Sequence, residues 1–175
     1  NISNVSFYAY EMHGHVKQTV ERYLKLSHKN VETLKRVATP CIDDHQIPPE
    51  EFAVKGLLDP IAARVVLKAL YVARIARMDV MWSVNMLARE VTKWIAACDR
   101  RLHRLVSYLH HTEDWSQLAF VGDKPSKCSL VQFSDASFAG DLKDSKSTSG
   151  CLLAIVGPST YVPLSWICKK AFGSF

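Results

Sequence analysis

The spacing of apolar and polar positions divides the chain into a helical first part and a strand-rich second part. From about Met12 to Leu26, apolar residues recur at helical spacing on one face and charged residues on the other, which predicts an amphipathic helix. Asp59 and Pro60 suit the N-cap and the first turn of another helix. That helix is predicted to run from Ile61 to Ala76 and to be buried, because it is apolar nearly all round.

Two further helices are predicted in the middle of the chain. Asp79 can cap a helix that carries Trp82, and another is expected from about Val91 to His110. The apolar stripe of this last helix consists of Val91, Ile95, Cys98, Leu102, Leu105 and Leu109. Its arginines, Arg100, Arg101 and Arg104, are expected elsewhere on its surface. The middle third is therefore predicted to be a compact helical unit.

After Thr112 the pattern changes to short β-rich runs separated by turn clusters. These runs are Gln117–Val121, Ser129–Ser134, Cys151–Val156 and Tyr161–Cys168. The last three predict an antiparallel three-stranded meander, so the fold class is α+β with an N-terminal helical region followed by that meander. We expect three regions: 1–59, a helix and a proline-containing linker; 60–112, a helical unit; and 113–175, the β-region.

Cysteine usage and hydropathy bear on the compartment. The five cysteines are odd in number, scattered and without a CxxC pair, which favours buried thiols in a reducing, intracellular compartment. No apolar run approaches the ~18 residues that span a bilayer, so no transmembrane segment is expected. Because Asn1 is not an initiator methionine, the chain is interpreted as processed or cut from something longer, and the organelle stays open.

The positive charge is concentrated in the middle of the chain. Of a net +5 overall, residues 60–111 carry nine basic and three acidic side chains, a net of +6. Such an excess can attract phosphate backbones, and it is also compatible with a solvated helical face. Two histidine pairs, His13 with His15 and His110 with His111, are either metal ligands or ordinary surface histidines.

Several short motifs follow one another in the β-region: Phe133–Asp141, Lys146–Gly150, Pro163–Trp166 and the pair Lys169-Lys170. In order and spacing they resemble the start of the RNase H domain of copia-type retrotransposon polyproteins. Upstream, Val37–Pro40, Ala69–Ala73, Arg77–Val80, Trp94 and Tyr108-Leu109 resemble the end of the reverse transcriptase and its helical connection to the nuclease. The resemblance implies that the β-region is the first half of an RNase H-like fold. Taken together, the matching motifs extend over nearly the whole chain.

The resemblance also implies a metal site. RNase H chemistry uses about four carboxylates that hold two Mg²⁺ ions. Here only Asp135 matches a ligand position of the family, so it is the single catalytic and metal-ligand candidate. Asp141 and Asp144 either compensate or are solvated turn residues. We therefore expect no enzymatic activity from the chain as it stands, and no cofactor unless missing carboxylates are supplied, in which case Mg²⁺ would bind.

Two functions remain open at the level of sequence. The chain is either a catalytically incomplete structural or adaptor subunit of a larger assembly, or a nucleic-acid-binding fragment of an active polymerase and RNase H that acts on RNA–DNA hybrids. In the first case a protein partner is expected to cover the edge and face of the sheet. In the second, the phosphate-binding candidates are Lys146, Ser147, Thr148, Arg100, Arg101 and Arg104.

Overall fold

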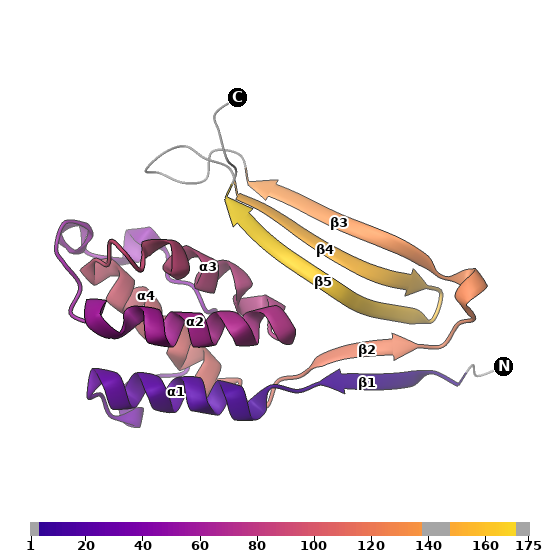
Figure 1. Ribbon diagram of the computed structural model, residues 1–175, viewed down its shortest axis with the longest axis horizontal. Helices are drawn as coiled ribbons and strands as arrows, with labels where there is room; N and C mark the ends of the chain where they lie inside the picture. The colour runs from indigo at the N-terminus through magenta and orange to yellow at the C-terminus, as the bar shows by residue number, and fades with distance from the viewer. Residues whose placement is uncertain (1–3, 138–147, 171–175) are drawn as a thin grey trace. The chain divides into compact units, whose positions relative to one another are not determined.

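The computed structural model describes residues 4–137 and 148–170 and divides the chain into two compact units (Figure 1). Residues Glu11–Ser116 form a helical unit. Residues Asn1–Tyr10 and Gln117–Phe175 form a second unit that is built around one β-sheet. Residues 4–10 therefore fold with the described residues of the C-terminal third of the chain, and 11–59 fold with the middle third. Assignment of the ranges 1–59, 60–112 and 113–175 to regions of a parent protein stays a prediction.

The helical unit contains four α-helices: α1 (His13–Ser27), α2 (Asp59–Ile75), α3 (Met81–Glu90) and α4 (Ala96–His111). Single 3₁₀ turns lie between them at Val31–Thr33, Asp44–Gln46, Pro49–Phe52 and Met78–Val80. The apolar stripes predicted from spacing form the core, because Val16, Val65 and Leu105 are each at most 1% exposed. Four predicted helices are thus confirmed in number and order.

Three helix starts differ from the prediction. Leu58, not Asp59, is the N-cap of α2, and Asp59 lies in the first turn, where its carboxylate pairs with Lys55 at 2.9 Å. Asp79 does not cap α3, because it lies in a 3₁₀ turn and accepts hydrogen bonds from Arg77. α4 begins at Ala96 and not near Val91, because Ile95 has extended backbone and forms a β-bridge with Lys55.

The sheet has five antiparallel strands in the order β1-β2-β5-β4-β3, so the expectation of a three-stranded sheet is wrong. Its strands are β1 (Ser6–Tyr10), β2 (Gln117–Val121), β3 (Ser129–Ser137), β4 (Thr148–Gly157) and β5 (Thr160–Lys170). The predicted meander of β3, β4 and β5 is present within it. The additional strands, β1 and β2, extend the sheet beyond β5, through the pair Phe120 and Tyr161.

Both faces of the sheet remain largely accessible. In the described part of this unit, the buried apolar residues are Ala119, Ala154 and Pro163, none of which has a large side chain. Leu130 on one face and Phe133 on the other are 65% and 48% exposed. β3 is an edge strand, because among the described strands it pairs with β4 alone. No helix in the described parts of the chain combines the length and apolarity needed to cross a membrane.

Candidate nucleic-acid interface

The predicted catalytic carboxylate, Asp135, lies near the end of β3 with an exposed side chain, opposite Gly150 of β4. Thr148 begins β4 opposite Ser137. The other candidates of this turn, Lys146 and Ser147, lie outside the described residues, as do Asp141 and Asp144. Mg²⁺ needs several oxygen ligands in near-octahedral geometry. Within 4–137 and 148–170, no three His, Cys, Asp or Glu side chains are grouped to hold a metal, so these residues do not by themselves fit the ion.

The three predicted arginines lie in the helical unit, and the structure gives them different roles. Arg101 is 7% exposed and forms an ion pair with Asp44, so its predicted surface position is wrong. Its guanidinium also lies 5.5 Å from the ring centre of Phe52. This arginine fastens the 3₁₀ turns of 44–52 onto α4, and its charge is compensated inside the protein.

Arg100 and Arg104 remain accessible at one side of α4. Arg100 donates from Nε to Glu51 Oε2 at 2.6 Å, and this hydrogen bond lowers the pKa of the Glu51 carboxyl. Arg104 donates from Nε and Nη2 to the backbone oxygen and the hydroxyl of Thr39, both at 3.1 Å. Since Thr39 carries no formal charge, the positive charge of Arg104 is not neutralised by this contact.

Arg100 and Arg104 border a groove of about 830 Å³ between α4 and the segment that joins α1 to α2. The groove is lined by both basic and apolar side chains. Its basic lining residues are Lys29, Lys35, Lys55, Arg100 and Arg104, with His103 beside them; its apolar ones are Val37, Ile42, Val54, Leu57, Leu58 and Ala96. The acidic lining residues are Glu51 and Asp99. Five cationic side chains against two carboxylates give the groove a net positive charge.

Asp99 holds the backbone of the groove lining in place at Leu57 and Leu58. Its carboxylate accepts hydrogen bonds from the backbone N–H groups of Leu57 and Leu58, at 2.7 and 3.2 Å, and from the indole of Trp94 at 2.6 Å. The backbone at Gly56 lies so close to Trp94 that a Cβ at position 56 would be 2.6 Å from the indole ring. Since three donors already satisfy Asp99, this carboxylate presents little free acceptor capacity to a bound ligand.

His103 connects the groove to the helical core. Its Nδ1 lies 2.8 Å from the Tyr23 hydroxyl and its Nε2 lies 3.1 Å from the backbone oxygen of Thr33. A carbonyl can only accept, so Nε2 carries the proton and Nδ1 accepts from the tyrosine. Burial lowers the pKa of His103, and the nearby Lys29 charge acts in the same direction. His103 is therefore a neutral positioning contact and does not add charge to the groove at neutral pH.

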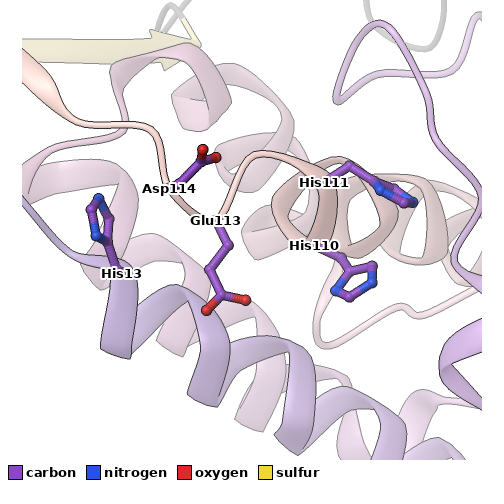
Figure 2. A pocket seen from close by; sticks show the side chains of 5 residues that line it. All are labelled: His13, His110, His111, Glu113 and Asp114. Atoms are coloured by element: carbon purple, nitrogen blue, oxygen red, sulfur yellow. The ribbon is translucent and has the colours of Figure 1, made fainter.

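A smaller pocket of about 230 Å³ in the same unit contains three of the histidines considered as metal ligands (Figure 2). His13 Nε2 lies 3.1 Å from the Ser116 hydroxyl, and His111 Nε2 lies 2.8 Å from the Leu34 backbone oxygen. Figure 2 shows that the rings of His13 and His111 do not converge on one point. Both of these rings have protein partners, so this pocket does not present a preformed ligand set.

The architecture defines an α+β chain with a basic helical unit and an antiparallel sheet. No family model and no solved structure matches this chain. Two curated proteins of Arabidopsis thaliana are similar over 148 residues, or 85% of the chain: the retrovirus-related Pol polyprotein from transposon RE1, at 28% identity, and that from transposon RE2, at 29%. The matched stretch covers 10% of each relative. The resemblance to a copia-type retrotransposon polyprotein is confirmed, and the chain is similar to a short stretch of it.

Several groove residues were not predicted from the sequence. Lys29 and Lys35 lie in the segment after α1, where the local net charge is close to zero, so charge counting gave no signal there. Asp99 lies in a strongly basic helix and looked like an isolated acid. Only the folding of 29–58 against α4 places these residues around one groove with Arg100 and Arg104.

Proposed function

We propose that this chain is a nucleic-acid-binding segment of a polymerase and RNase H-type retrotransposon polyprotein, and that the groove beside α4 binds the phosphate backbone. The observation that carries the proposal is the surplus of cations around this groove, whose two acidic neighbours already have protein donors. Similarity to the two Pol polyproteins supports the class of protein. The chain spans about a tenth of the length of these relatives. That it belongs to a protein with polymerase and nuclease activities is therefore part of our proposal.

All three lysines of the groove lining, Lys29, Lys35 and Lys55, are exposed. The ammonium groups of Lys29 and Lys35 make no hydrogen bond or ion pair within the described parts of the chain. Lys55 pairs with Asp59, but 76% of its side chain is accessible, and an exposed ion pair of this kind is worth little and exchanges readily for another anion. Phosphate contacts of this sort carry no direct sequence code, so binding should not depend on base sequence.

A salt titration tests the proposal. An RNA–DNA hybrid duplex should bind the chain, and the logarithm of its affinity should fall linearly with the logarithm of the salt concentration, by about 0.9 per phosphate contact on duplex DNA. The double variant Lys29→Gln with Lys35→Gln should weaken binding and reduce the slope by roughly one to two. The matched control, Lys17→Gln with Lys25→Gln, removes the same charge from exposed positions of α1 outside the groove and should change the slope much less. If the groove variant and the control variant changed the salt dependence equally, binding would depend on the total positive charge of the chain and not on the groove.

Catalysis is a separate outcome of the same experiment. We expect the chain to bind the hybrid without cleaving it, with Mg²⁺ or Mn²⁺ present, because Asp135 alone supplies too few ligands for a two-metal site. Turnover that Asp135→Asn abolishes would show a complete site and contradict this expectation.

The sheet favours a second candidate, a structural or adaptor subunit held by a protein partner. Among the described strands, β3 has one unpaired edge along its nine residues, which include no lysine or proline, and unprotected edges recruit other strands. Leu130, 65% exposed, and Ile167, 50% exposed, lie on one sheet face that a partner could cover. If this candidate is right, sedimentation of the chain alone should show self-association that one specific partner relieves. A monomer at high concentration that also binds the hybrid would favour the nucleic-acid function.

A further inference from the structure

Three aromatic side chains lie side by side across three strands of the sheet. Phe7 of β1 is directly opposite Phe120 of β2, and Phe120 is directly opposite Tyr161 of β5. Residues directly opposite each other in antiparallel strands project from the same face, with Cβ atoms about 4.5–5.5 Å apart. The register therefore places the three rings in one row across the sheet, which we call the aromatic row (Phe7, Phe120 and Tyr161).

The rings of the aromatic row are accessible to a ligand. Phe7 is 67% exposed and Phe120 is 41% exposed, while Tyr161 is half-buried. The described part of the sheet unit contains no α-helix to cover them. Large exposed apolar side chains that form a contiguous group mark an interaction surface more often than scattered ones.

Positive charge lies at the end of the sheet where the row is found. The connection from β2 to β3 carries Lys124 and Lys127, both exposed. Thr160, the neighbour of Tyr161, holds the start of this connection through its hydroxyl, which accepts from the N–H groups of Gly122 and Asp123 at 3.1 and 3.0 Å. The Asp123 carboxylate accepts from the Ser159 N–H at 2.6 Å and is thus engaged within the protein. Two lysines remain to attract an anion.

We propose that the aromatic row binds single-stranded nucleic acid, with bases stacked on Phe7, Phe120 and Tyr161 and phosphates attracted by Lys124 and Lys127. Aromatic side chains on adjacent strands of an antiparallel sheet stack two or three bases in sheet-based RNA-binding domains, and stacking tolerates any base. The lysines favour this ligand over an apolar protein surface, because a protein partner of that kind gains nothing from uncompensated cations. The inference deepens the proposed function and rests on it for the class of ligand, but it concerns a different unit of the chain.

The opposite face of the same strands provides a matched control. Tyr8 of β1 is 58% exposed, but it lies opposite Ala119 and therefore has no ring beside it on β2. A Tyr8→Leu variant removes an exposed ring from the same strand without touching the row. Leucine at position 7 or 120 keeps an apolar, strand-compatible side chain and removes only the stacking surface.

Binding of fluorescent oligo(dT) and oligo(U) of about twelve nucleotides to the 175-residue chain tests the proposal by anisotropy. The double variant Phe7→Leu with Phe120→Leu should bind both oligonucleotides roughly tenfold or more weakly, since each lost stack is costly. Tyr8→Leu should bind as the unaltered chain does. Thermal unfolding of each variant shows whether the sheet is retained. A double variant that keeps its sheet and binds as tightly as the unaltered chain would overturn the proposal.

Photo-crosslinking gives a second readout that needs no variant. A 5-bromouridine oligonucleotide bound to the unaltered chain should crosslink to peptides that contain residues 4–10, 117–121 or 160–170, as mapped by mass spectrometry. Crosslinks confined to other segments would overturn the proposal even if the double variant failed to fold.

The outcomes separate this site from the groove. Hybrid binding that depends on Lys29 and Lys35, with no binding of single strands, would overturn the aromatic row and leave the proposed function standing. Loss of self-association in the double variant, with unchanged oligonucleotide affinity, would make the row a protein contact and also overturn it. Failure to bind either nucleic acid would overturn both.

Discussion

Arg77 is an almost fully buried charged side chain, 2% exposed, and it joins two helices of the helical unit. It donates from Nε and Nη2 to both carboxylate oxygens of Asp79, at 2.9 and 2.8 Å. It also donates to the backbone oxygen and the hydroxyl of Thr112, at 2.8 and 2.7 Å, just beyond α4. Tyr108 and Trp115 lie with their ring centres 5.7 and 5.6 Å from the guanidinium carbon. The motif Arg77–Val80, which carried part of the family resemblance, thus has a structural role in this chain.

Replacing this arginine should destabilise the helical unit strongly. Arg77→Met leaves the Asp79 carboxylate and the Thr112 acceptors without their donor, and we expect a loss of about 3 kcal/mol in the free energy of unfolding. Arg77→Lys should recover only part of it, because an ammonium group cannot bind Asp79 and Thr112 through a planar fork. Urea denaturation followed by circular dichroism measures the loss. The control Arg74→Met, at an exposed position of α2, should stay close to the unaltered chain, and an equal loss there would refute the assigned role.

His103 links stability to pH. Burial lowers its pKa below the ordinary value of 6.5, so the folded state holds the proton less tightly than the unfolded state. Its contribution is therefore fully present above pH 6.5 and is lost as the pH falls through that value toward the folded-state pKa. Protonated Nδ1 can no longer accept from the Tyr23 hydroxyl, which is the physical reason for the loss.

We expect the urea midpoint to fall as the pH is lowered through 6.5, and the fall to be smaller in His103→Gln. His45→Gln, at an exposed position, serves as the control and should keep the pH dependence of the unaltered chain. A His103→Gln variant with an undiminished pH dependence would assign the effect to other groups.

At the scale of elements, the seam between β2 and β5 decides whether the sheet has five strands. The register contains one residue pair between β2 and β5, Phe120 with Tyr161. The two hydrogen bonds that the Thr160 hydroxyl accepts from the backbone after β2 therefore contribute much of what holds the two strands together. Thr160 is 5% exposed. A Cβ at Gly122 would lie 2.8 Å from the Ser159 backbone oxygen, which shows how closely the two segments approach.

Thr160→Val should loosen this seam while keeping the size and β-branching of the side chain. Two backbone N–H groups would lose their acceptor, at a cost of about 1–3 kcal/mol. Hydrogen exchange followed by mass spectrometry should show faster exchange in 117–123 and little change in α2 or α4. Ser159→Ala keeps the backbone N–H that binds Asp123, so it should leave exchange unaltered. Faster exchange throughout the chain in Thr160→Val would instead indicate a global loss of stability.

At the scale of the whole molecule, the two units differ in how they bury apolar surface. The helical unit has a core of large side chains such as Tyr23, Leu87 and Leu102, each at most 1% exposed. The described strands of the sheet unit bury only small residues and Pro163. Because burial of apolar surface is the main source of stability, the sheet unit should be much less stable.

We therefore expect the chain alone to unfold in two steps, with the sheet unit first. Hydrogen exchange under native conditions should be fast in β1 to β5 and slow in α2 and α4, and denaturant curves followed by different probes should not coincide. Nucleic acid or a partner that binds the sheet should slow exchange there. One cooperative transition with uniform protection would contradict this expectation and show that the sheet is stabilised by contacts other than its described core.

Much of the local structure was predictable because it depends on short-range patterns. The apolar stripes of α1 and α2 have helical spacing, and four of the five strands were found from β-rich runs between turn clusters. The motif around Asp135 also carried the resemblance to a retrotransposon polyprotein, which the comparisons confirm. By itself, then, the sequence determined the fold class, the order of most elements and the resemblance to retrotransposon polyproteins.

Tertiary structure decided what depends on residues far apart in the chain. β1 was missed although Phe7, Tyr8 and Tyr10 favour strands, because its partner, β2, lies beyond the entire helical unit and nothing near β1 in the sequence indicates that pairing. Arg101 was expected at the surface because its own helix gives no sign of Asp44, which neutralises it and allows its burial. The groove around Arg104 and the row formed by Phe7, Phe120 and Tyr161 arise in the same way. Each exists only once distant segments are brought together, since neither charge nor aromatic character along one segment specifies which other segment will lie beside it.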